Sequence, residues 1–148
     1  MPDEISLVEL EPQDVLVVSG HVAHDGIPAF LGMAFGETMG AMRGTPPAGP
    51  PFARYDLCDD GFDIEAGFPV STPVDASGRA EARTLPGGPA ATVMHRGPYE
   101  SLASVYAAVG AWIGEHGYVV AGAPWESYLD GPEVAEPRTM VTWPCRPA

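Results

Sequence analysis

The chain has 148 residues, of which 45% are hydrophobic, and it carries 20 acidic side chains against seven arginines and no lysine. This length and apolar content can bury one core, which excludes a disordered chain. The negative charge repels phosphate backbones, so we expect no direct binding to nucleic acid.

No apolar run is long enough to cross a bilayer, and residues 1–4 lack the basic and apolar regions of a signal peptide. We therefore expect a cytoplasmic protein without membrane contacts, in which Cys58 and Cys145 are free thiols. The acidic excess would attract cations, although net charge also serves solubility alone.

In the first half, residues 5–10 and 15–19 have strand character and are separated by a turn. Apolar residues at helical spacing predict a helix over 27–42, which a glycine- and proline-rich segment ends. Strands over 52–57 and 62–70 should follow, joined by a hairpin-like Asp-Asp-Gly turn.

The second half opens after a polar turn at 75–78. Its predicted strands are 79–85, 91–95, 125–129 and 138–143, and its predicted helix is 99–116. On that helix, Tyr106 and Trp112 belong to an apolar stripe, so we assign both to the core.

Two segments repeat along the chain. Residues 51–55 (PFARY) recur 73 positions later as 124–128 (PWESY), and residues 24–26 (HDG) recur as 95–97 (HRG). The pattern predicts one α+β domain of two βαββ units, about 1–74 and 75–148, with two main helices and about eight mostly antiparallel strands. Duplicated units commonly meet about a pseudo-two-fold axis, so we expect a ligand cleft at their seam.

The repeats differ at one chemically important position, because Ala53 in the first corresponds to Glu126 in the second. Strand alternation puts Glu126 and Tyr128 on one face, and Tyr55 on the matching face of the first repeat. A buried unpaired carboxylate is costly, and a bound cation with aromatic neighbours would relieve that cost. The alternatives are that Glu126 pairs with Arg54 or Arg96, or is solvated.

Residues 95–100 (HRGPYE), the following amphipathic helix, 124–129 (PWESYL) and the final strand with its flanking prolines resemble the gyrase-inhibitor-like (GyrI-like) effector-binding family. The resemblance covers nearly the whole chain. It implies a duplicated βαββ fold that binds diverse, often aromatic and cationic small molecules between its halves. In drug-responsive regulators of this family the module follows a DNA-binding domain, whereas here we expect a stand-alone member.

The resemblance and the strand pattern together define a candidate ligand site. Glu126 would supply the charge, and the stacking or lining surfaces would come from Tyr128, Trp125, Tyr55, Phe52, Tyr99, Met33 and Phe30. For Trp125 and Phe52, packing under the helices is an equal alternative, whereas helical spacing favours the ordinary core over the pocket for Met33 and Phe30.

Three functions remain open. The first is a multidrug-type binding protein for amphipathic, cationic aromatic compounds, used for sensing or sequestration. The second is a hydrolase of electrophilic cyclopropane-bearing natural products, with Glu126 as general base and Tyr99 or Tyr128 orienting water or polarising a carbonyl. The third is a regulatory module that binds a protein partner.

We expect neither a metal nor a cofactor. His21 and His24 lie three positions apart without a cysteine or carboxylate cluster to complete a site, and His95 should make a structural hydrogen bond before its helix. Neither a phosphate-binding glycine loop nor a nucleophile elbow occurs in the sequence.

Overall fold

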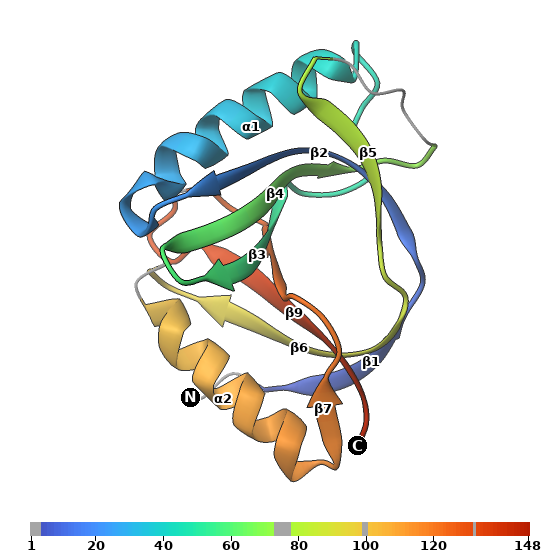
Figure 1. Cartoon of the computed structure of the whole chain (residues 1–148), viewed down its shortest axis with the longest axis vertical. Coiled ribbons are helices and arrows are strands. Elements are labelled where there is room, and N and C mark those ends of the chain that lie inside the picture. The colour runs from blue at the N-terminus through green and yellow to red at the C-terminus, as the bar shows by residue number, and fades with distance from the viewer. Residues whose placement is uncertain (1–3, 73–77, 99–100, 132) are drawn as a thin grey trace. The chain divides into compact units, whose positions relative to one another are not determined.

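The computed structural model describes residues 4–72, 78–98, 101–131 and 133–148 (Figure 1). The chain folds into two compact units. One comprises Met1–Glu11 with Pro86–Ala148, and the other comprises Pro12–Leu85. The second unit therefore extends to Leu85, past the expected repeat boundary near residue 74, and the chain's first strand belongs to the other unit. Within the described residues, no helix has the length and apolar character needed to cross a membrane.

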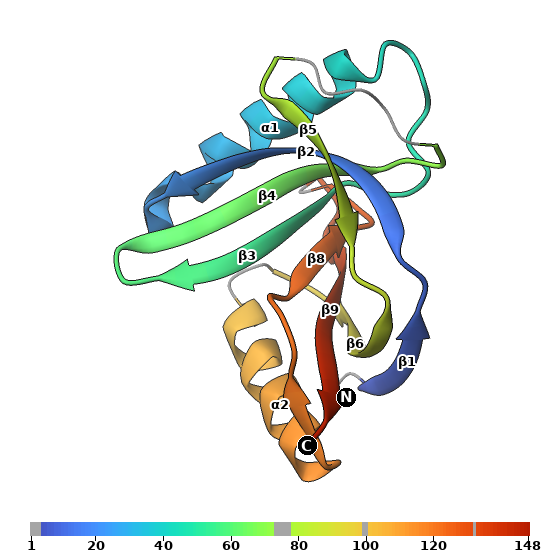
Figure 2. The same ribbon diagram turned by 45° about the vertical axis from the view of Figure 1, so that its right-hand side comes forward.

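The Pro12–Leu85 unit is an antiparallel sheet with one main helix. Its elements are β2 (Gln13–Val22), the short 3-10 helix η1 (His24–Gly26), α1 (Ile27–Ala41), β3 (Phe52–Cys58), β4 (Gly61–Pro69) and β5 (Ala80–Leu85). The strand order is β3-β4-β2-β5. Figure 2 shows β3 and β4 as a hairpin, as the Asp-Asp-Gly turn predicts.

Helix α1 packs on β2 and β4 through small and aromatic side chains. Phe30, Ala34 and Thr38 form its buried face, and Thr38 Oγ1 donates to the Ala34 carbonyl at 2.6 Å. The Phe30 ring lies so close to Gly20 of β2 that a Cβ there would approach Phe30 Cε1 to 2.5 Å. Glycine at position 20 thus lets the helix sit on the strand.

The other unit repeats this plan. Its elements are β1 (Ser6–Leu10), β6 (Gly88–Arg96), α2 (Leu102–Glu115), β7 (Tyr118–Val120), β8 (Trp125–Tyr128) and β9 (Arg138–Pro147). The order is β8-β9-β6-β1, all antiparallel, and β7 also pairs with β9.

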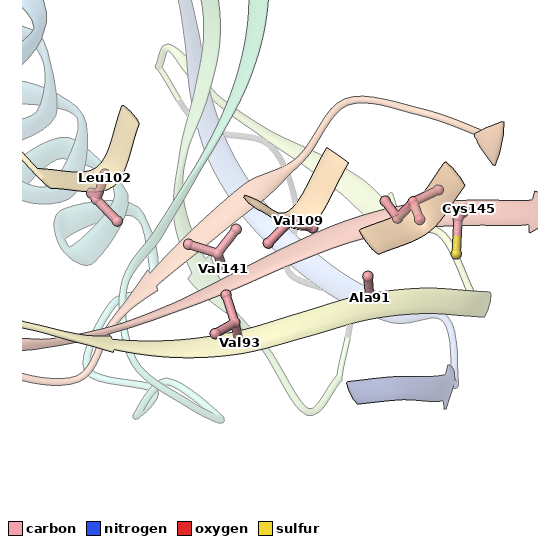
Figure 3. Close-up of a cluster of buried hydrophobic side chains, with 7 residues drawn as sticks. Ala91, Val93, Leu102, Val109, Val141 and Cys145 are labelled. Atoms are coloured by element: carbon pink, nitrogen blue, oxygen red, sulfur yellow. The ribbon is translucent and has the colours of Figure 1, made fainter. Parts of the chain in front are cut away.

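Helix α2 covers a cluster of buried hydrophobic side chains on the strands of this unit. Figure 3 shows Ala91 and Val93 of β6 beside Val141 of β9, on the side of the strands that faces Val109. Leu102, Ile113 and Cys145 complete the cluster. Burial of each large aliphatic side chain contributes about 1.5–3 kcal/mol.

These topologies confirm the predicted α+β fold and the duplicated βαββ unit, since β2-α1-β3-β4 corresponds to β6-α2-β8-β9. The fourth strand of each sheet comes from outside that motif, β5 in one case and β1 in the other.

Strand β7 was missed, because its three residues give too short a pattern. Strand β9 also continues beyond its predicted end at residue 143, and its last residue, Pro147, pairs with Tyr118.

Candidate functional site

Strand alternation places Glu126 on the helix-covered face of its own sheet. Glu126 lies opposite Val141, and Tyr128 lies opposite Thr139. Since Val141 belongs to the cluster beneath α2, Glu126 and Tyr128 point to the same side. Glu126 is buried, with 8% of its surface exposed.

Two phenols hold the Glu126 carboxyl group. Tyr106 of α2 donates to Oε2 at 2.6 Å, and Tyr128 donates to Oε1 at 2.8 Å. The Tyr106 ring packs edge-on against Trp143, with 5.8 Å between ring centroids, and Trp143 Nε1 donates to the Gly122 carbonyl. Because Trp143 holds the Tyr106 ring in place, Tyr106 in turn fixes the position of the Glu126 carboxyl group.

Burial raises the pKa of the Glu126 carboxyl group above its ordinary value. The hydrogen bonds from Tyr106 and Tyr128, and the nearby His95, act in the opposite direction without cancelling the effect of burial. An ionised carboxylate accepts about four hydrogen bonds, and the two phenols use two of them. The group can thus receive a further donor or cation.

A buried hydroxyl lies on the strand position opposite Tyr128. Thr139 is fully buried, and its Oγ1 finds no hydrogen-bond partner within the described ranges. On β9 it stands between Tyr128 of β8 and His95 of β6. A buried hydroxyl without a partner costs about 1–3 kcal/mol, which a ligand's polar group could recover.

His95 makes the structural hydrogen bond expected for it. Its Nε2 lies 3.1 Å from the Pro98 carbonyl, which only accepts, so this nitrogen carries the proton. Ser101 Oγ donates to the same carbonyl at 2.8 Å. This turn fixes the start of α2, the helix that supplies Tyr106.

The structure does not pair Glu126 with an arginine or leave it solvated. Among the described residues, no ion pair includes Glu126. Arg138, on the neighbouring strand, contacts Asp130 through Nε at 2.9 Å and Nη2 at 3.2 Å. Arg138 holds the pKa of the Asp130 carboxyl group below its usual value.

The remaining predicted site residues fall in different places. Trp125 is buried on the face of β8 opposite to Glu126. Tyr55 packs edge-on against Phe62 at 6.0 Å in the other unit, which also contains the buried Phe52 and Phe30 and the half-buried Met33. Tyr99 lies outside the described residues. Of the predicted set, the structure brings Glu126 and Tyr128 into direct contact.

Tyr106 was assigned only to the core, and this was incomplete. Its ring is part of the apolar stripe, but its hydroxyl reaches Glu126. A buried tyrosine usually finds a partner for its hydroxyl, and this rule was the available signal. Thr139 gave no signal, because its orphaned hydroxyl depends on the register of three strands.

The fold brings a cysteine and a carboxylate to His21 that the sequence analysis did not place there. Cys58 and Asp63 lie beside it, with one potential ligand atom from each of the three residues within 4.8 Å of the others. Antiparallel pairing of β2, β3 and β4 brings them together, and their separation in the sequence concealed it.

Comparison with known families identifies the fold. Residues 3–145 match the model of the GyrI-like small molecule binding domain. The chain belongs to the GyrI-like family. The comparison with curated protein sequences gives no match.

Several solved structures share this GyrI-like fold. EcmrR in its DNA complex is 25% identical with a TM-score of 0.83; the match covers 99% of this chain but only 58% of the EcmrR chain. The isolated EcmrR C-terminal domain matches over the full length of both chains, at 24% identity and a TM-score of 0.83.

Two more distant structures show the fold alone. SAV2435 bound to tetraphenylphosphonium is 14% identical, with a TM-score of 0.66 and coverage of 97% of this chain and 94% of its own. A hydrolase from Listeria innocua is 16% identical, with a TM-score of 0.63 and coverage of 97% and 92%.

Proposed function

We propose that this GyrI-like domain binds amphipathic, cationic aromatic compounds at Glu126, for sensing or sequestration. The observation that carries the proposal is a buried carboxyl group held by two phenols and by no basic side chain among the described residues. Burial raises the free energy of the ionised carboxylate, and a bound cation would lower it again.

The neighbouring rings suit such a ligand. Tyr106 and Tyr128 place aromatic rings beside the carboxylate, and a cation over a ring face gains about 0.5–2 kcal/mol. A cation about 5 Å from the carboxylate, at an effective dielectric constant of about 20, gains roughly 3 kcal/mol. That corresponds to about a hundredfold in affinity.

Tetraphenylphosphonium, the compound bound to SAV2435, is a suitable first probe because it is cationic, aromatic and unable to donate hydrogen bonds. The test is calorimetric titration of the wild type, Glu126→Gln and Glu136→Gln. The last variant removes an equal charge from an exposed bend and is the matched control. We expect about a hundredfold loss for Glu126→Gln and less than a twofold change for the control.

Fluorescent lipophilic cations and their neutral analogues extend the test. The neutral analogues should lose little affinity with Glu126→Gln. Equal losses for charged and neutral ligands would reject Glu126 as a counter-ion, and absence of binding across the panel would reject the small-molecule proposal.

Hydrolysis is a second candidate, favoured by the raised pKa of a buried carboxyl group in contact with phenols. Glu126 would take a proton from water while the water oxygen bonds to a cyclopropane carbon. The ring C–C bond would break, leaving its electron pair on the electrophile's acceptor group. Turnover of a cyclopropane-bearing electrophile by the wild type, and its loss in Glu126→Gln, would support this chemistry. Binding of the electrophile without turnover would reject hydrolysis and favour the binding function.

A further inference from the structure

A separate cluster of potential ligand groups lies in the Pro12–Leu85 unit. His21 is near the end of β2, Cys58 ends β3, and Asp63 lies on β4 directly opposite His21. Asp60 belongs to the β3–β4 turn, whose hairpin is visible in Figure 2. Neighbouring strands therefore gather imidazole, thiol and carboxylate groups at one end of this sheet.

The spacing of these groups is close to that of a metal-ligand set. His21 Nδ1 lies 2.8 Å from Asp63 Oδ1, and Cys58 Sγ lies 3.4 Å from Asp63 Oδ2. Donor atoms bound at about 2.0–2.3 Å to a tetrahedral ion are roughly 3.3–3.7 Å apart. Small rotations of these solvent-accessible side chains would admit an ion in place of the shared protons.

Asp60 supplies the feature that distinguishes this cluster from a simple ion pair. Its Oδ1 lies 3.0 Å from His21 Nε2, the ring nitrogen that faces away from Asp63. Metal-binding histidines commonly donate their second N–H to a carboxylate, which fixes the tautomer and orients the ring. Here Nδ1–H donates to Asp63 at 2.8 Å, so an ion that displaces this proton would meet the Nδ1 lone pair and the Asp63 carboxylate together.

We propose that His21 Nδ1, Cys58 Sγ and the Asp63 carboxylate bind one divalent transition-metal ion, with Asp60 orienting His21. The mixed nitrogen, sulfur and oxygen donors favour Zn²⁺ over the hard ions Mg²⁺ and Ca²⁺. The thiolate and carboxylate charges balance the ion, and the chain's formal charge of −13 attracts cations. Binding forms the three metal–ligand bonds and releases the displaced protons to solvent.

Two titrations of the reduced full-length chain test the site. Co²⁺ should give a near-ultraviolet thiolate-to-cobalt absorption at one equivalent, absent in Cys58→Ser. Calorimetry with Zn²⁺ should give one saturable site. Asp60→Asn should weaken it by about 10–100-fold, and His21→Ala, Cys58→Ser and Asp63→Asn should weaken it at least as much.

Nearby groups provide matched controls. His24→Ala and Asp59→Asn change an exposed histidine and an exposed acid next to the cluster and should bind Zn²⁺ within about twofold of the wild type. Metal-free thermal melts verify that each variant is folded. Absence of saturable Zn²⁺ binding in the wild type, or full Co²⁺ absorption in Cys58→Ser, would overturn the proposal.

Discussion

Replacing Glu126 by glutamine should remove a pH-dependent cost of burying the carboxylate. Because burial raises the pKa of Glu126 above its unfolded value, its favourable contribution is complete below the unfolded pKa. That contribution is lost as pH rises through the folded pKa. The wild type should therefore lose stability relative to Glu126→Gln by up to about 1.4 kcal/mol per pH unit within that interval, and then reach a constant difference.

Urea unfolding of both proteins between pH 4 and pH 8, at about half-unit steps, measures this difference. Subtracting one curve from the other removes the contributions of the remaining carboxylates and histidines. Glu136→Gln, which neutralises an exposed acid, should run parallel to the wild type. A constant difference between wild type and Glu126→Gln over the whole range would mean that burial does not raise the pKa of Glu126.

The other predictions concern the partners of this carboxyl group. Tyr106→Phe and Tyr128→Phe each remove a hydrogen bond to Glu126; at neutral pH each should cost about 1.5–3 kcal/mol in urea unfolding, and less once Glu126 is protonated. Thr139→Val removes a hydroxyl that has no hydrogen-bond partner among the described residues, so the free energy of unfolding should stay the same or increase. A decrease of more than about 1 kcal/mol would show that the hydroxyl does have a partner. Affinity for lipophilic cations should fall as pH decreases through the pKa of Glu126, and titration of Glu126→Gln should show no such fall.

Much of the fold could be predicted because both helices and most strands carry strong local signals. The α2 stripe, for example, contains Leu102, Val109 and Ile113, and all three are buried as its spacing requires. Short β7 could not be found in this way, since its pairing with the end of β9 is a tertiary contact.

The site was only partly accessible from the sequence. Glu126 stood out as the difference between two similar segments, and strand alternation correctly joined it to Tyr128. Tyr106 has both an apolar ring and a hydroxyl group, and helical periodicity predicted only the burial of the ring. The cluster of His21, Cys58 and Asp63 depends on strand register, which a single sequence leaves open.

The pKa of Glu126, read from its carboxyl carbon by NMR with and without a bound lipophilic cation, shows directly whether this buried carboxylate is the counter-ion of the ligand. We expect a value above that of an ordinary glutamate in the free protein and a decrease when the cation binds. An ordinary pKa that does not change when the cation binds would rule out Glu126 as a buried counter-ion.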